Sequence, residues 1–101
     1  MLFSVLHRIQ LGQVLPSKGT FEDLIIREDI LDKVKITQEE ITEFEIKTIE
    51  NRLQWNGEKA KDIEIELTNA ETEHVKKALK DLSEKKELDA SYLSLYKLFN
   101  S

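Results

Sequence analysis

The chain has 101 residues, of which 40% are hydrophobic and 35% are charged, with a formal net charge of −5 and no cysteine. This length and composition predict a single folded domain over residues 1–101. The lack of cysteine excludes a disulfide framework and a thiolate metal site, and it favours a reducing compartment such as the cytoplasm. The negative balance argues against direct binding to nucleic acid or to an anionic membrane, because both require a clustered basic face.

The first six residues are apolar apart from Ser4, but a signal peptide carries its basic residues before the apolar run. Here His7 and Arg8 follow the run instead. No stretch reaches about 18 apolar residues, the length expected of a membrane-spanning helix. We therefore expect neither secretion nor membrane insertion.

The N-terminal third of the sequence predicts two helices. Apolar residues at helical spacing place the first over about residues 2–15, and Pro16 ends it. The second begins after Thr20 and ends near Lys35. The residues expected to face the core are Leu2, Val5, Leu6 and Ile9 in the first helix and Phe21, Leu24, Ile25, Leu31 and Val34 in the second, where Ile26 and Ile30 widen the face.

Three threonines mark helix starts, because each is followed three residues later by an acidic residue. In such a capping box the hydroxyl accepts a hydrogen bond from a free amide of the first turn, and the acid reaches back to the cap. Thr20 starts the second helix, Thr37 a short helix of about two turns, and Thr68 a longer helix. The core side of the longer helix carries Val75, Ala78, Leu79 and Leu82.

From Phe44 the hydrophobic pattern alternates, as is typical of strands. With Glu50 and Asn51 as the corner of a hairpin, the inner face consists of Phe44, Ile46, Thr48, Leu53 and Trp55. Residues 62–67 predict a half-buried third strand, whose register the sequence leaves open. We therefore predict an α+β fold with about five helices, two or three N-terminal and two C-terminal, around a small antiparallel meander of two or three strands.

Asp89 caps a last helix, and Leu88 before the cap is placed to contact Leu93. This helix is apolar around most of its circumference. Packing on the core is the ordinary explanation, and a homodimer interface is the functional one, because a small monomer rarely exposes a large apolar patch. The candidate interaction residues are Tyr92, Leu95, Tyr96 and Phe99.

The middle of the chain is acidic, since residues 22–73 carry 16 acidic side chains against 7 basic ones. The order of helices and hairpin is that of a winged helix, but residues 38–45 would present four acids to DNA, and repulsion rules out the usual docking. The charge allows the inverse hypothesis, an inhibitor that imitates phosphate on a host nucleic-acid-binding enzyme, although a solvated surface is the commoner explanation. The acids concerned are Glu39, Glu40, Glu43, Glu45, Glu64 and Glu66.

Few side chains suggest chemistry. The histidines are His7 and His74, and Glu71 precedes His74 at the Glu-x-x-His spacing of di-iron bundles. Such a site needs a second copy of the motif, which the sequence lacks, so we expect Glu71 to cap a helix and His74 to lie at the surface. We expect His7 to be a partly buried helix residue. The three glycines are isolated and form no phosphate-binding loop. The sequence thus predicts no metal, no cofactor and no enzymatic activity.

A further pattern is spread over most of the chain. Its segments are Phe3-Ser4-Val5 with Arg8, residues 15–21 (LPSKGTF), Trp55-Asn56, residues 64–66 (EIE), residues 78–82 (ALKDL) and residues 94–99 (SLYKLF). In these segments the chain resembles a family of short bacteriophage and prophage proteins of unassigned function. The family offers no catalytic or binding residues to transfer. The resemblance implies a setting in bacterial cytoplasm and a non-enzymatic module that binds a protein of unknown identity or a second copy of itself.

Overall fold

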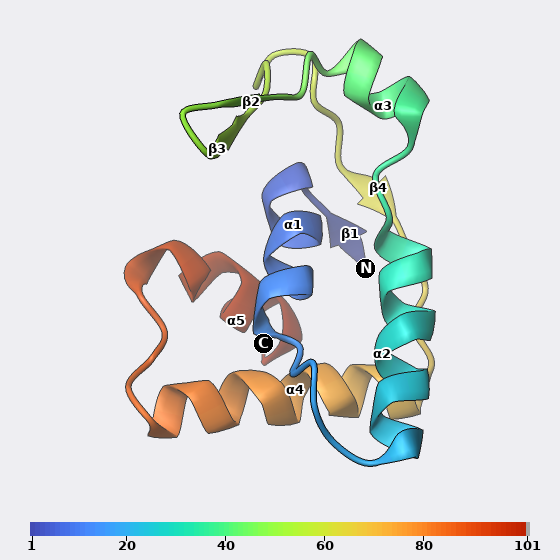
Figure 1. Cartoon of the computed structure of the whole chain (residues 1–101), viewed down its shortest axis with the longest axis vertical. Coiled ribbons are helices and arrows are strands. Elements are labelled where there is room, and N and C mark those ends of the chain that lie inside the picture. The colour runs from blue at the N-terminus through green and yellow to red at the C-terminus, as the bar shows by residue number, and fades with distance from the viewer. Residues whose placement is uncertain (101) are drawn as a thin grey trace.

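The computed structural model describes residues 1–100, which form five α-helices, one short 3₁₀ helix and two separate antiparallel sheets of two strands each (Figure 1). This arrangement confirms the predicted α+β class. The helices are α1 (Val5–Val14), α2 (Phe21–Val34), α3 (Gln38–Glu43), α4 (Asn69–Glu84), the 3₁₀ helix η1 (Ala90–Tyr92) and α5 (Leu93–Phe99). The strands are β1 (Leu2–Phe3), β2 (Lys47–Ile49), β3 (Arg52–Gln54) and β4 (Ile63–Glu64).

Capping boxes confirm the three helix starts predicted from the threonines. The side chains of Thr20, Thr37 and Thr68 each accept a hydrogen bond from the amide three residues on, and the acid at that position bonds back to the threonine amide. A fourth box, which the sequence analysis missed, joins Ser4 to His7 at the start of α1. Because the first turn of a helix lacks internal partners for its amides, these boxes fix where the four helices begin.

The first helix begins three residues later than the periodicity predicts. Leu2 and Phe3 instead form β1, which pairs with β4 in the register Leu2↔Glu64 and Phe3↔Ile63. The extended conformation places the Phe3 ring in the core, where it is fully buried. The predicted third strand therefore joins the N-terminal segment and not the hairpin, and only two of its residues are paired.

Strands β2 and β3 form the predicted hairpin. Glu50 and Asn51 occupy its corner with φ values of 52° and 65°, the positive values that a two-residue type I′ turn requires. Thr48 pairs with Leu53, the register expected of this short turn. Of the predicted inner face, Phe44 is buried at the base of the hairpin, whereas Leu53 is 46% exposed. The strands themselves therefore stand clear of the core (Figure 1).

The core lies where α1 packs against α2, α4 and α5, and Figure 1 shows α1 between the other three. Each of these helices and strand β1 contributes fully buried side chains, so the core joins both ends of the chain. These side chains are Phe3, Leu11, Ile30, Val75, Leu79 and Leu95.

The predicted core face of α2 is wrong at two residues near its N-terminal end. Phe21 is 75% exposed and Ile25 is 45% exposed, although both were expected in the core. Helix α2 instead buries Ile30 and the predicted core residue Val34, with Ile26 partly buried, so its core face lies towards the residues expected only to widen it. Adjacent residues differ by a rotation of about 100° around a helix, so a shift of one position exchanges core for solvent.

Two phenylalanines test this division between core and surface. Phe99 is 3% exposed, and we expect Phe99→Ala to lower the free energy of unfolding by about 3 to 5 kcal/mol, because the truncation leaves a cavity. The matched control Phe21→Ala removes an exposed ring and should change the free energy by no more than about 0.5 kcal/mol. Urea denaturation followed by circular dichroism measures both values, and equal losses would contradict the described core.

Candidate interaction surface

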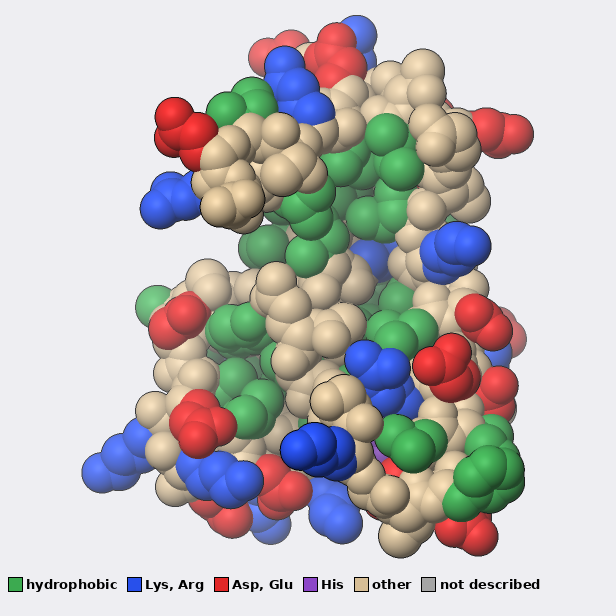
Figure 2. Space-filling view, in the orientation of Figure 1, with side chains coloured by type: hydrophobic (Ala, Val, Ile, Leu, Met, Phe, Trp, Pro, Cys, Tyr) green, Lys and Arg blue, Asp and Glu red, His purple; other side chains and the backbone are tan. Residues whose placement is uncertain are grey.

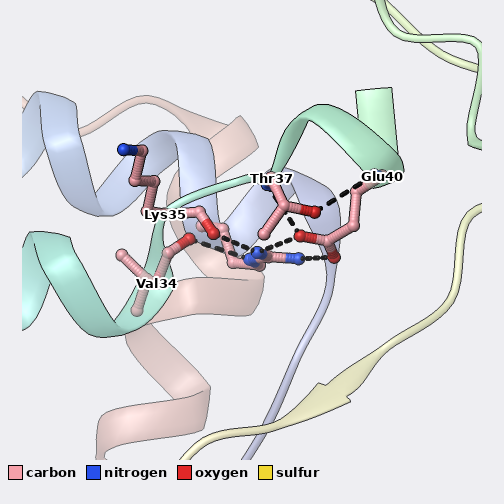
Figure 3. Close-up of polar contacts among 5 residues, drawn as sticks. Val34, Lys35, Thr37 and Glu40 are labelled. Carbon is pink, nitrogen blue, oxygen red and sulfur yellow. Dashed lines mark hydrogen bonds and ion pairs between the residues drawn. The ribbon is translucent and has the colours of Figure 1, made fainter. Parts of the chain in front are cut away.

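The side chain of Arg8 is almost completely buried and holds three elements together. Figure 3 labels the residues around it, Val34, Lys35 and Glu40, and marks the hydrogen bonds between the residues drawn. Its Nε donates to the carbonyl of Val34 at 2.9 Å, and Nη2 donates to the carbonyl of Lys35 at 2.6 Å. Nη1 and Nη2 also donate to the two carboxylate oxygens of Glu40, at 2.6 and 2.8 Å. Arg8 thus ties the end of α2 and the start of α3 to α1, and these contacts occupy most of its donors.

Glu40 completes this network as the acid of the α3 capping box. Its Oε1 accepts the amide hydrogen of Thr37 at 2.9 Å in addition to the bond from Arg8. The hydrogen bonds from Arg8 are the main reason that the pKa of Glu40 falls from 4.5 to about 2. Both charges are therefore used within the fold, and the pair serves a structural role instead of presenting a free charge to a ligand.

An open groove of about 620 Å³ runs between α2, α3 and the segment that leads to β4. Its charged lining mixes both signs, with Lys33, Lys35 and Lys61 close to Asp32 and Asp62. Such a lining has no net preference for anions or cations. The groove therefore identifies no class of charged ligand.

The predicted acidic surface is largely neutralised by neighbouring cations. Besides Glu40, Glu43 lies 3.6 Å from Lys61, Glu45 lies 3.2 Å from Lys59, and Glu64 lies 2.7 Å from the amino group of Met1. Within residues 1–100, the members of the set without an ion-pair partner are Glu39 and Glu66. Because a phosphate row presents unpaired negative charges, this arrangement gives no support to the inhibitor hypothesis.

His7 makes a contact with a serine that the sequence analysis missed. Its Nδ1 accepts the amide hydrogen of Ser4 at 3.2 Å, and its Nε2 lies 2.8 Å from Oγ of Ser94 on α5. An Nδ1 that accepts leaves the proton of a neutral imidazole on Nε2, so Nε2 donates to Ser94 and has no lone pair to take the serine proton. This pair is therefore not an activated nucleophile.

The second histidine lies in a different place. His74 lines a small hollow with Asp23 and Lys77, while Glu71 caps α4 as predicted and also accepts a hydrogen bond from Lys33 at 2.5 Å. Over residues 1–100, no group of three or more potential ligands is placed to hold a metal ion. None of the helices in that range has the length and apolar character needed to cross a bilayer.

The four C-terminal residues predicted to interact fall into two pairs. Leu95 and Phe99 are buried in the core, where the ring of Phe99 lies 5.9 Å from that of Phe3. They therefore cannot form an exposed interface, because residues four apart lie on the same side of a helix and this side faces inward. Tyr92 and Tyr96 are only partly buried and remain available at the surface.

Tyr92 and Tyr96 border a hollow of about 390 Å³ between the end of α4, η1 and α5, which we term the C-terminal hollow. Leu88, Ala90 and Leu93 complete its apolar lining, and Leu93 is 54% exposed. Figure 2 shows hydrophobic side chains in this region, at the lower left of the view. The charged lining residue, Asp89, already accepts hydrogen bonds from the amide and hydroxyl of Ser91.

Comparisons with protein-family models, curated proteins and solved structures found no match to this chain. The case for a function therefore depends on the geometry of its surfaces. Among these, the C-terminal hollow combines exposed apolar area with aromatic side chains that carry a polar end, which is the composition favoured at protein interfaces.

Substitution of Glu40 tests the structural role of its pair with Arg8. A depressed carboxyl pKa stabilises the fold above pH 4.5, and this contribution is lost as the pH falls towards about 2. The lowering of the Glu40 pKa from 4.5 to about 2 corresponds to about 3 kcal/mol. Glu40→Gln should therefore lower the free energy of unfolding by about this amount at pH 7 and by much less near pH 2. The exposed Glu39→Gln serves as the control. Chemical denaturation across this pH range measures the difference, and parallel curves for wild type and Glu40→Gln would refute the assignment.

Proposed function

We propose that the protein is a non-enzymatic interaction module that self-associates through the C-terminal hollow. The observation that carries this proposal is the hollow itself, an apolar depression with Tyr92 and Tyr96 at its edge and Leu93 exposed beside it. Burial of this surface against a second copy would remove apolar area from water, which is the main driving force of protein association.

A symmetric dimer fits the character of this surface. In a two-fold interface the same patch meets itself, so the patch has to be free of uncompensated like charges at its centre. The lining carries one charged residue, Asp89, whose hydrogen bonds from Ser91 satisfy the carboxylate without neutralising it, so a dimer would have to keep the two Asp89 side chains away from the two-fold axis. The hydroxyl of Tyr92 donates to Gln13 at 2.7 Å, which holds the ring in place before binding and reduces the entropy lost on association.

The hollow would form the centre of a larger contact. A protein interface of ordinary size buries about 800 Å² per partner, about a ninth of the 7047 Å² that this chain exposes. The interface would therefore extend from the hollow over the adjoining sides of α4 and α5. The resemblance to bacteriophage and prophage proteins is the ground for placing this module in the cytoplasm of an infected or lysogenic bacterium.

Light scattering coupled to size-exclusion chromatography tests self-association. At high micromolar concentration we expect a mass of twice 11.8 kDa, and we expect Leu93→Glu and Tyr96→Glu to shift the protein to the monomer, because each buries an unpaired charge at the seam. Leu53→Glu alters a leucine of similar exposure on the hairpin, 46% against 54% for Leu93, and should leave the dimer intact.

Circular dichroism confirms that each variant is folded before its mass is compared. A wild-type protein that stays monomeric at every concentration would refute the proposal. If the dimer persists in both C-terminal variants but dissociates in Leu53→Glu, the interface lies on the hairpin and not at the C-terminal hollow.

A further inference from the structure

Three polar side chains on one side of α1 hold the C-terminal elements in place. Besides the contact of His7 with Ser94, Nε2 of Gln10 donates to the carbonyl of Ser91 at 2.8 Å, and Gln13 accepts the hydroxyl hydrogen of Tyr92 at 2.7 Å. The three residues are spaced three apart, so they lie along one side of the helix. Hydrogen bonds, together with the buried apolar contacts, therefore join α1 to η1 and α5.

His7 differs from the two glutamines because it bonds to two parts of the chain and changes its charge near neutral pH. Nδ1 accepts from the amide of Ser4 at the cap of α1, while the proton on Nε2 points to Oγ of Ser94. A neutral ring with its proton on Nε2 satisfies both contacts at once. A protonated ring cannot, because Nδ1 then carries a hydrogen that faces the Ser4 amide hydrogen.

We propose that His7 is an acid-sensitive clamp, which in its neutral form joins the start of α1 to α5 and which protonation opens. When Nδ1 gains a proton, the ring has to rotate away from Ser4 to relieve the contact between two donors. The rotation withdraws Nε2 from Ser94, so the half of the α1 capping box made by the ring and the hydrogen bond of the ring to α5 are lost together, while Oγ of Ser4 still accepts from the amide of His7. The clamp acts within one chain, and the inference does not depend on self-association.

The surroundings of His7 keep the clamp closed at neutral pH. Burial lowers the pKa of His7 below its ordinary value of 6.5, and the carboxylate of Asp62, in the segment before β4, partly opposes this effect. The groups that α1 and α5 place against the ring, Ser4 and Ser94, are uncharged. Since the folded protein binds this proton less readily than the unfolded chain does, stability is complete above pH 6.5 and declines as the pH falls below that value.

Nuclear magnetic resonance of the wild-type protein tests the clamp directly. Long-range nitrogen–proton spectra at about pH 7.5 should show His7 with its proton on Nε2, and its titration midpoint should lie below 6.5. The amide signal of Ser94 should move with the same midpoint. A proton on Nδ1 at neutral pH, or a midpoint at or above 6.5, would overturn the inference.

Two variants separate the halves of the clamp. Glutamine is a favoured residue at this position of a capping box, so His7→Gln should keep α1 capped but remove the titration. The urea concentration at the unfolding midpoint of the wild type should decrease when the pH is lowered from about 7 to about 5, and that of His7→Gln should decrease less. His74→Gln is the control and should behave like the wild type.

Ser94→Ala should leave the titration of His7 in place but uncouple the amides of α5 from it. Equal pH dependence in wild type and His7→Gln would refute the clamp, and the wild-type spectra decide the question if a variant fails to fold.

Discussion

The arrangement of the chain depends on one buried guanidinium. Arg8 supplies hydrogen-bond donors to the carbonyls of Val34 and Lys35, at the end of α2, where a helix has no internal donors left to offer. It also holds the carboxylate of Glu40, and with it α3, a six-residue helix that is too short to be stable alone. The hairpin follows α3, so its position relative to the core depends on this contact, whereas β4 is held by its pairing with β1. The positive charge of Arg8 therefore stabilises the fold and is not available to bind a ligand.

The features that the sequence predicts well are local in origin. The boxes begun by Thr20, Thr37 and Thr68 involve residues three apart, and the corner at Glu50–Asn51 involves adjacent ones, so short-range chemistry determines them. Apart from the Ser4–His7 box, two main features that the sequence did not predict depend on partners far along the chain. β1 forms because β4 is available to pair with it, and Arg8 is buried because three segments converge on it. Neither the formation of β1 nor the burial of Arg8 can be predicted from the residues adjacent in the sequence.

The candidate site was half predicted for the same reason. The apolar composition of the C-terminal helix predicted that one side is buried and that further apolar side chains remain at the surface. Composition does not say which residues belong to each group. The structure turns Leu95 and Phe99 inward and leaves Tyr92 at the surface. This rotation follows from contact with Phe3 and from the polar bonds to α1, which periodicity cannot reveal. The resulting surface is smaller than predicted, it borders a hollow, and the hydrogen bond to Gln13 holds the side chain of Tyr92 in position.

The hairpin formed by β2 and β3 has a different consequence. Its strands contact each other far more than any other element, and all six of their residues face solvent. Mutations there alter the character of the exterior without disturbing the interior, so selection on this part of the chain is nearly free of the demands of folding. Such a segment is where a small protein acquires new specificity most readily, and where an engineer has the best place to graft a foreign loop.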